Sequence, residues 1–285
     1  GLNFIDVYHR TGLYKQELPF TPGVEGAGVV EAVGPDVTNV KEGDRVAYAG
    51  SLGGYAEERL IDAERVVKLP DEISSEQAAG MMLQGMTAQM LLRSVFPVHE
   101  GDMILVHAAA GGVGLIMCQW AAALGATVIG TVGTEDKAEL ARAHGCAHPI
   151  LYSKQDFVAQ VQAITAGEKL PVAYDSVGRD TFMKSLDCLK LRGLMVSFGN
   201  ASGPPDPIPP NLLAQKGSLY LTRPTLFHYI ATREQLEQSA NELFEGVASG
   251  KVKIEVQQRF ALKDAAEAHR QLEARKTTGS TILTV

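Results

Sequence analysis

The sequence predicts an α/β protein in which a doubly wound, parallel six-stranded sheet is joined to a second, mostly β domain. Between about residues 86 and 224, apolar strand segments alternate with helical patterns, which is typical of βαβ units around a parallel sheet. The first 85 residues contain short β-rich runs separated by Gly and Pro, which favours a compact β unit. A length of 285 residues suits about two domains of ordinary size.

Six strands and four helices are expected in the α/β block. The strand candidates are short apolar segments at residues 103–108, 126–131, 149–152, 172–176, 194–198 and 219–222. The helix candidates carry apolar residues three and four positions apart, so that each can bury one face on the sheet; they span residues 112–124, 137–144, 157–165 and 181–191. A proline-rich stretch at 203–210 cannot continue a helix and is expected at the surface.

The β-rich block contains three runs, at residues 26–34, 44–48 and 65–69. After Pro224 the pattern predicts a helix over 233–248, a strand, a helix over 264–275 and a last strand over 280–285. This tail is short for a domain of its own, so we expect it to complete the first domain. The expected division is therefore residues 1–86, residues 87–224, and residues 225–285 returning to the first domain.

Charge and cysteine content exclude several classes of protein. Lys and Arg number 26 against 33 Asp and Glu, a net charge of −7, so no chain-wide basic field attracts nucleic acid or anionic lipid. Cys118, Cys146 and Cys188 are odd in number and lack C-x-x-C spacing, which argues against disulfides and thiolate metal sites and favours a reducing, cytoplasmic compartment. No apolar run is long enough to span a bilayer. Because the chain begins with Gly1 rather than Met, we expect an N-terminal piece to precede it.

A glycine-rich loop lies between the first strand and the first helix of the α/β block, in the segment HAAAGGVG at residues 107–114. In the Rossmann fingerprint G-x-G-x-x-G, its three positions correspond to Ala109, Gly111 and Gly114. They provide a tight turn, a close approach of the backbone to pyrophosphate, and tight packing of helix on strand. N–H groups at the helix start would then hold a diphosphate without a charged side chain. The plain alternative is a turn that only joins strand to helix, and the βαβ context favours the nucleotide.

The end of the second strand predicts which dinucleotide is bound. An NAD site has a carboxylate about 20 residues after the glycine loop, which accepts from the ribose 2′-hydroxyl, but this strand ends in GTVGT at 130–134 without an acid. Glu135 and Asp136 follow, and then Lys137, whose ammonium can reach a 2′-phosphate together with the Thr134 hydroxyl. The alternative is that Lys137 is a solvated lysine in the first turn of a helix. The missing acid favours NADP(H).

Several motifs follow one another in a familiar order: GVEGAGVVEAVG at 23–34, GDRV at 43–46, the loop at 107–114, AYDSVG at 173–178 and GLMVSFG at 193–199. With these motifs the whole chain resembles the medium-chain dehydrogenase/reductase superfamily, and within it the zinc-free NADPH-dependent quinone oxidoreductases related to zeta-crystallin. The resemblance implies a Rossmann NADP-binding domain, a GroES-like catalytic domain completed by the C-terminal tail, and a homodimer. It implies an NADPH:quinone oxidoreductase acting on a small-molecule quinone or other conjugated carbonyl.

The resemblance also implies a cofactor site, most of it at the carboxyl ends of strands, where an open α/β sheet binds ligands. Asn3 and Tyr8 would lie beside the nicotinamide and ribose, and are the predicted catalytic residues. The remaining expected cofactor contacts are Thr87 at the domain junction; Gly112 and Val113 at the diphosphate; Gly133, Thr134, Lys137 and Tyr152 around the 2′-phosphate; Ser176, Phe198, Gly199 and Asn200 along the strand tips; Pro224, Thr225 and Leu226 beyond the last strand; and Arg275 on the last helix.

The chain departs from the zinc-dependent alcohol dehydrogenases of the same superfamily. Those enzymes place a catalytic Cys where this chain has Asn3 and a zinc-ligating His where it has Val24. Their four-cysteine loop has no counterpart between Tyr48 and Tyr55, and the seven histidines show no ligand spacing. We therefore expect no metal site.

The absence of zinc suits a quinone, which spreads incoming charge over conjugated oxygens, whereas an unactivated carbonyl needs a Lewis acid. The Asn3 amide and the Tyr8 hydroxyl are candidate donors to the nascent hydroquinone anion. Reduction of an enone or 2-alkenal by NADPH is a second hypothesis that the sequence hardly separates from the first. A non-catalytic crystallin-like or RNA-binding role is a third, and the net charge weighs against it.

Plainer roles compete for several of these residues. Tyr8 is almost equally well explained as an aromatic core residue, and Asn3 as a turn or strand-edge amide. His107 is more simply a hydrogen-bonded core imidazole than a general acid. The strand segment at 218–222 has few charges to protect its edge, which predicts pairing with a second copy. Methionines at near-helical spacing are expected to pack a helix; they are Met81, Met82, Met86 and Met90.

Overall fold

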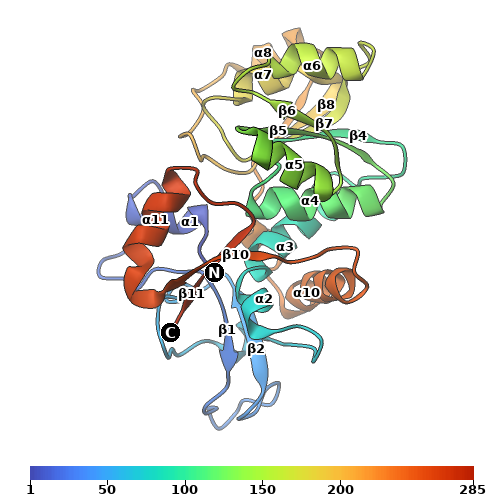
Figure 1. The fold of residues 1–285 in the computed structure, drawn as a ribbon. Coiled ribbons are helices and arrows are strands. Elements are labelled where there is room, and N and C mark those ends of the chain that lie inside the picture. The colour runs from blue at the N-terminus through green and yellow to red at the C-terminus, as the bar shows by residue number, and fades with distance from the viewer. The chain divides into compact units, whose positions relative to one another are not determined.

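The computed structural model describes residues 1–285 as two compact units (Figure 1). One unit contains Gly1–Gln89 together with Leu226–Val285, and the other contains Met90–Thr225. The chain therefore leaves the first unit after its N-terminal part and returns to it for the last sixty residues.

The Met90–Thr225 unit is built on a six-stranded sheet with the order β6-β5-β4-β7-β8-β9, and all neighbouring strands are parallel. Chain order reverses between β4 and β7, which makes the sheet doubly wound. The predicted fold class is confirmed. The strands are β4 (Met103–Val106), β5 (Thr127–Val132), β6 (Cys146–Leu151), β7 (Leu170–Asp175), β8 (Leu189–Ser197) and β9 (Tyr220–Thr222).

Helices join the successive strands of this sheet. They are α4 (Gly112–Ala123), α5 (Glu135–Ala143), α6 (Phe157–Ile164), α7 (Phe182–Asp187) and α8 (Pro210–Gln215), with a π-helical turn, η2 (Met90–Val95), before β4. The proline-rich stretch is largely exposed, as expected. It ends where Pro210 begins α8, in the first turn, where the N–H groups have no acceptor within the helix and the missing N–H of proline costs no helical hydrogen bond.

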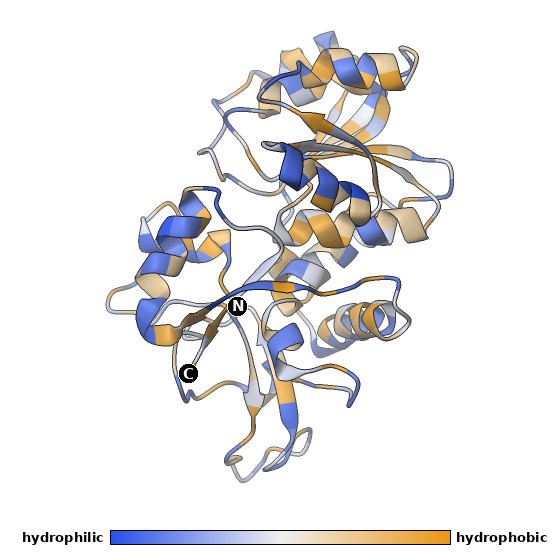
Figure 2. Cartoon of the chain, in the orientation of Figure 1, coloured by the Kyte–Doolittle hydropathy of each residue, from blue (hydrophilic) through white to orange (hydrophobic).

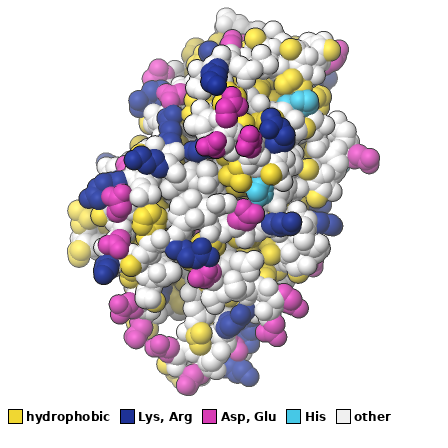
Figure 3. Space-filling model, viewed as in Figure 1, with side chains coloured by type: hydrophobic (Ala, Val, Ile, Leu, Met, Phe, Trp, Pro, Cys, Tyr) yellow, Lys and Arg dark blue, Asp and Glu magenta, His cyan; other side chains and the backbone are white.

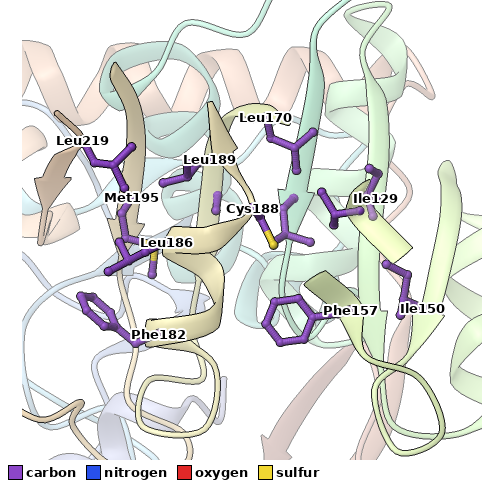
Figure 4. Packing of buried hydrophobic residues seen from close by; sticks show 13 residues of the cluster. Ile129, Ile150, Phe157, Leu170, Phe182, Leu186, Cys188, Leu189, Met195 and Leu219 are labelled. Atoms are coloured by element: carbon purple, nitrogen blue, oxygen red, sulfur yellow. The ribbon is translucent and has the colours of Figure 1, made fainter. Parts of the chain in front are cut away.

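One face of the sheet is closed by α6 and α7 (Figure 4). Phe157 of α6 and Phe182 and Leu186 of α7 pack against Ile129 of β5 and Met195 of β8, among other strand residues of one buried cluster. Because a parallel sheet is covered on both faces, its strands are continuous apolar runs, and this is the signal by which the sequence predicted them.

The expected helix over residues 181–191 is wrong at its C-terminal end. The helix α7 ends at Asp187, and Leu189 already belongs to β8, where it pairs with Leu170 of β7. Apolar residues at helical spacing continue into this strand, so local spacing gave no boundary. The strand β8 also begins earlier than expected. Its register with β7 shifts between Leu189 and Leu194, and Arg192, which lies between them, has a φ of 60°.

The other unit contains an antiparallel sheet of β1 (Glu25–Val29), β2 (Arg45–Ala49) and β3 (Val67–Lys68), and a parallel pair of β10 (Val256–Ala261) and β11 (Ser280–Thr284). The first predicted run, 26–34, forms a strand only as far as Val29 because Gly and Pro follow within a few residues. The third run, 65–69, is a strand only at Val67–Lys68 because its first residue closes the 3-10 turn η1 (Ala63–Arg65).

Helices make up more of this unit than its β-rich sequence suggested. They are α1 (Phe4–Arg10), α2 (Ser75–Ala79), α3 (Met82–Gln89), α9 (Leu226–Tyr229), α10 (Arg233–Ala248) and α11 (Ala265–Glu273), with a second 3-10 turn, η3 (Leu262–Asp264). Figure 2 shows hydrophobic and hydrophilic residues interleaved along α10, and its apolar side packs on α3. A Cβ at Gly85 would lie 2.5 Å from Leu243, so glycine permits this close approach. The four methionines are buried, which confirms their packing role.

Candidate functional site

The glycine-rich loop joins β4 to α4, as predicted. Gly111 is the N-cap residue, and no side chain caps the helix, so the first N–H groups of α4 have no acceptor within the helix. A Cβ at Gly114 would lie 2.3 Å from the carbonyl oxygen of Ala108, which explains why only glycine fits there. This helix start presents N–H groups and the positive end of the helix dipole, a cradle that suits a diphosphate at Gly112 and Val113.

Four residues predicted to surround a 2′-phosphate lie together at the tips of β5 and β6. Thr134 is the N-cap residue of α5, and its hydroxyl accepts a hydrogen bond of 3.3 Å from the N–H of Lys137. Tyr152 directly follows β6, and a Cβ at Gly133 would lie 3.0 Å from its hydroxyl. The backbone of Tyr152 donates to the carbonyl of Val132 at 3.2 Å. The site therefore combines a lysine, two hydroxyls and a glycine.

The first acid after β5 is Glu135, the residue that follows Thr134. Glu135 accepts from the ammonium of Lys154 at 3.1 Å, so its carboxylate is already in an ion pair. Both side chains of this pair are more than half exposed. The residues at the tip therefore fit a 2′-phosphate better than a free 2′-hydroxyl.

The tips of β7 and β8 contact each other. Ser176 follows β7, and Phe198, Gly199 and Asn200 follow β8. A Cβ at Gly199 would lie 2.5 Å from the carbonyl oxygen of Ser176, so the two tips pack backbone against backbone. Since all six strands are parallel, these tips lie at the same edge of the sheet as the glycine loop, as does the segment with Pro224 and Thr225 after β9.

Asp175 shapes the turn after β7, a role that sequence analysis missed. The carboxylate is fully buried, and it accepts from the N–H groups of Val177 at 2.7 Å and Gly178 at 3.0 Å. The Thr181 hydroxyl lies within 2.9 Å of both carboxylate oxygens. The motif AYDSVG contained this residue, but only the folded turn identifies it as the acceptor that holds Ser176 in place.

The remaining predicted site residues belong to the other unit. Asn3 is the N-cap residue of α1 and Tyr8 lies within that helix. Thr87 lies in α3, where its hydroxyl donates to the carbonyl of Leu83 at 2.6 Å. Leu226 is the first residue of α9, and Arg275 follows α11 with a φ of 59°.

The Asn3 side chain is held from two sides. Its Nδ2 donates to Oε2 of Glu25 at 2.6 Å, and its Oδ1 accepts from Nε2 of Gln84 at 3.1 Å. Tyr8 is 8% exposed, and its ring meets Tyr14 edge-on with centroids 5.1 Å apart. Both the catalytic and the packing interpretation of Tyr8 therefore remain compatible with its position.

A polar cluster of buried Asp6 and His269 with half-buried Tyr55 lies next to Asn3 and was not predicted. The Tyr55 hydroxyl donates to Oδ2 of Asp6 at 3.2 Å and lies 2.9 Å from Nε2 of His269. The N–H of Asn3 donates to the same Asp6 oxygen at 2.9 Å. Burial raises the pKa of Asp6 to about 6, and it lowers the pKa of His269. Residues so far apart in the chain gave no local signal of this contact.

His107 is a hydrogen-bonded core imidazole, as expected. Ser185 donates its hydroxyl to the Thr181 carbonyl at 2.8 Å, so it accepts from Nε2–H of His107, also at 2.8 Å. The other ring nitrogen, Nδ1, then accepts from the Thr131 hydroxyl at 2.8 Å. Burial lowers the pKa of His107 and keeps the ring neutral, which this pattern of hydrogen bonds requires.

Arg59 holds the loop where zinc-dependent relatives carry four cysteines. The guanidinium donates to the carbonyls of Ser51 at 3.1 Å and Leu52 at 2.7 Å, and it lies 4.7 Å from the centroid of the Tyr48 ring. No group of three or more His, Cys, Asp or Glu side chains is placed to hold a metal ion. The three cysteines are buried and unpaired. None of the helices combines the length and the apolar character that crossing a bilayer requires.

Comparisons with known proteins agree with this architecture. Residues 1–71 match the model of the alcohol dehydrogenase GroES-like domain, and residues 112–245 match that of the zinc-binding dehydrogenases. A quinone oxidoreductase of Pseudomonas aeruginosa is 56% identical over 99% of this chain and 88% of its own length. The 2-haloacrylate reductase of a Burkholderia species is 48% identical over 99% of this chain and 87% of its own length.

A solved structure of Escherichia coli quinone oxidoreductase complexed with NADPH superimposes with a TM-score of 0.98 at 52% identity, covering 100% of this chain and 89% of that one. Identity at this level over nearly the whole chain, together with the doubly wound sheet and the GroES-like domain, settles the family. The chain belongs to the quinone oxidoreductases of the medium-chain dehydrogenase/reductase superfamily.

Proposed function

We propose that this protein is an NADPH:quinone oxidoreductase that transfers reducing equivalents to a quinone without zinc. The observation that carries the proposal is the tip of β5, where Tyr152 lies against Gly133, Thr134 caps the helix turn that contains Lys137, and the acid Glu135 is paired with Lys154. The relatives named quinone oxidoreductase and the NADPH complex of the Escherichia coli protein support it.

NADPH, when bound, supplies the hydride, and the protein binds and orients the reactants. The start of α4 would hold the diphosphate through backbone N–H groups, and Lys137 with Thr134 and Tyr152 would hold the 2′-phosphate. The other proposed cofactor contacts are Asn3, Tyr8, Thr87, Ser176, Phe198, Gly199, Asn200, Pro224, Thr225, Leu226 and Arg275. A lysine ammonium carries the charge opposite to that of a phosphate, so Lys137 favours the phosphorylated cofactor.

Asn3 and Tyr8 are the proposed catalytic residues. Their N–H and O–H groups would donate to the oxygen on which negative charge develops as the quinone accepts the hydride, and solvent would complete protonation. A quinone requires no metal for this step because conjugation already spreads the charge. Asn3 and Val24 at the positions of two zinc ligands, and the absence of any suitable group of ligands, support this view.

The decisive experiment compares electron acceptors. NADPH oxidation is followed at 340 nm with 1,4-benzoquinone and with a short 2-alkenal, both with EDTA present and both against mixtures without protein. The proposal predicts rapid turnover of the quinone. Activity toward the alkenal alone would reject it.

Reduction of an activated double bond is the second candidate function. The observation that favours it is the similarity to a protein named 2-haloacrylate reductase, which is nearly as close to this chain as the quinone oxidoreductases are. An RNA-binding role is weaker, since the face seen in Figure 3 mixes basic and acidic side chains and shows no basic stripe.

We also propose a homodimer in the cytoplasm, with residues 87–224 as the NADP-binding domain and residues 1–86 and 225–285 as the catalytic domain. The division into two units supports the domain assignment. Tyr220 and Leu221 of the edge strand β9 are 61% and 39% exposed, and Leu191 of β8 is 75% exposed, which supports pairing with a second copy. Three unpaired thiols support a reducing compartment.

A further inference from the structure

A chain of four buried polar side chains runs through the GroES-like unit and ends at Glu25, with Asn3 next to last. Ser280 of β11 donates its hydroxyl to Oε1 of Gln84 at 3.0 Å, and Nε2 of Gln84 donates to Oδ1 of Asn3 at 3.1 Å. Nδ2 of Asn3 then donates to Oε2 of Glu25 at 2.6 Å. All four residues are less than 9% exposed, so water does not compete for these hydrogen bonds.

Glu25 determines which group donates and which accepts in each of these side-chain hydrogen bonds. Its other oxygen, Oε1, accepts from the backbone N–H of Leu83 at 2.8 Å, and the N–H of Met82 also donates to this carboxylate, both in the first turn of α3. An ionised carboxylate can only accept hydrogen bonds, and a backbone N–H group can only donate one. The nitrogen of the Asn3 amide must therefore face Glu25, and its oxygen must face Gln84.

The charge on Glu25 is expensive to bury, and this argues for a purpose beyond packing. Burial raises the pKa of Glu25, whereas the charge of the nearby Gly1 ammonium and, after it, the N–H donors of Asn3, Leu83 and Met82 oppose that rise. An apolar residue would fill the same space without this cost. The carboxylate has one effect that an apolar residue would lack, because it selects one of the two orientations of the Asn3 amide.

We infer that Glu25 is the positioning residue of the active site, and that Gln84 assists it. One hydrogen of Asn3 Nδ2 is used by Glu25, and the second is the donor that the site presents to the reacting carbonyl oxygen. Were the amide reversed, an oxygen would stand in place of that donor, and it would repel the developing negative charge. The inference rests on the proposed function, since it gives Asn3 its catalytic role.

Glu25→Gln tests this with almost no change of shape. The oxygen of the new amide would have to accept from Leu83 and Met82, so its N–H group would face Asn3 and the amides of Asn3 and Gln84 would reverse. We expect kcat with 1,4-benzoquinone to fall about tenfold, the scale of one hydrogen bond to a charged group, while KM for NADPH changes little. A residue that only supported packing would lower the melting temperature without this split between kcat and KM.

The double variant Glu25→Gln/Gln84→Glu guards against a loss of folding. It keeps one buried carboxylate and the side-chain hydrogen bonds around Asn3, but it holds the Asn3 amide reversed. We expect a melting temperature near that of the wild type and a kcat as low as that of Glu25→Gln. A matched control is Glu242→Gln, which alters another carboxylate–amide pair of this unit, with Gln89 at 2.8 Å, and should keep wild-type kcat.

A readout without cofactor or substrate comes from NMR of protein labelled with ¹⁵N-asparagine, in which Asn3→Ala assigns the Asn3 signal. The short bond to Glu25 predicts one side-chain N–H shifted downfield in the wild type and restored to an ordinary position in Glu25→Gln. An Asn3 signal that is the same in both proteins would overturn the inference.

The background of Asn3→Ala separates the two proposals. If Glu25 acts through Asn3, Glu25→Gln has no further effect on kcat in that background. An equal loss in both backgrounds, or a wild-type kcat in folded Glu25→Gln, overturns the positioning role while the quinone reductase activity of the wild type stands. A wild-type protein that does not reduce quinones overturns the proposed function, and the positioning role with it.

Discussion

Lys137 is the proposed partner of the 2′-phosphate that distinguishes NADP from NAD. On that proposal, replacing it by alanine would remove one charged hydrogen bond, which is worth about 1–3 kcal/mol. We expect the Kd of NADPH, measured by quenching of protein fluorescence, to rise by about tenfold to a hundredfold. The Kd of NADH should be almost unchanged because NADH has no 2′-phosphate.

Lys190→Ala is a matched control for this experiment. Lys190 is exposed at the amino-terminal start of β8, and in a parallel sheet that is the edge opposite the cofactor site. Its removal should leave both affinities unchanged. If Lys137→Ala weakened the binding of NADPH and NADH equally, the proposal that Lys137 binds the 2′-phosphate would be contradicted.

Asp6 makes a pH-dependent contribution to stability. Burial raises its pKa from 3.8 to about 6, so the fold holds this proton more tightly than the unfolded chain does. The stability that Asp6 contributes is therefore full below pH 3.8 and is lost as pH rises to about 6. Two pH units correspond to about 3 kcal/mol.

Asp6→Asn should not show this loss. An Asn oxygen in place of Oδ2 can accept from both Asn3 and Tyr55, as the carboxylate does. Relative to the wild type, we expect its free energy of unfolding to improve by up to about 3 kcal/mol between about pH 4 and pH 7, as measured by urea denaturation. A difference between the two proteins that does not vary with pH would contradict the assignment of a raised pKa.

At the scale of residues, the sequence predicts features that depend on neighbouring residues better than contacts between side chains that are distant in the sequence. The position of Thr134 and Lys137 just after β5 was predictable because the end of a strand is a local feature, and their contact with a 2′-phosphate stays a prediction. The contacts of Tyr55 with Asp6 and with His269 were not predictable, because these residues are 49 and 214 positions from Tyr55 and nothing local joins them. The Tyr55 hydroxyl is the centre of this polar cluster, since it contacts both Asp6 and His269.

At the scale of elements, α4 packs closely on the glycine loop that joins it to β4. In Gly114→Ala the new methyl group would lie 2.3 Å from the Ala108 carbonyl oxygen, and backbone cannot yield as a flexible side chain can. We expect the free energy of unfolding to fall by about 1–3 kcal/mol, the usual cost of overpacking, and NADPH to bind more weakly as α4 shifts.

Gly34→Ala provides the control, because the nearest atom to the new methyl group would be Cγ2 of Val37 at an ordinary 3.8 Å. It should have little effect on stability or on NADPH binding. If Gly114→Ala were as stable as Gly34→Ala in urea, the close packing of α4 on the loop would be refuted.

Helices and strands were predictable where their buried residues form a regular apolar pattern over many positions. The strands of the parallel sheet and α10 follow from apolar runs and helical spacing over many residues. Short helices such as α1 and α2 lie inside a block dominated by Gly, Pro and β-branched residues, where capping at Asn3 and Ser74 is the main local signal. The boundary between α7 and β8 depends on the pairing of Leu189 with Leu170, which no local pattern contains.

At the scale of the whole molecule, the edge strand β9 predicts self-association. Light scattering should give the mass of two chains at micromolar concentration. Leu221→Lys places a charge on the edge and should give the mass of one chain, because a buried unpaired charge is costly in such an interface. Leu60→Lys is the control, since Leu60 is 98% exposed but lies outside the sheet. A wild-type protein with the mass of one chain would refute the dimer.

The order of the strands was predictable at this scale because alternating strands and helices allow few topologies. The network of Ser280, Gln84, Asn3 and Glu25 was not, because it joins the last strand of the chain to its first helix. Such series of hydrogen bonds form only when the helices and strands are packed together, so local sequence patterns do not predict them.

The most direct test is a single-turnover experiment with purified protein, stoichiometric NADPH and excess EDTA, mixed with 1,4-benzoquinone and followed at 340 nm. We expect NADPH to be consumed far faster than in the mixture without protein, at a rate that EDTA does not change, and far faster than NADH under the same conditions. A rate no greater than that of the protein-free mixture, or one that EDTA abolishes, would contradict zinc-independent transfer from NADPH to a quinone.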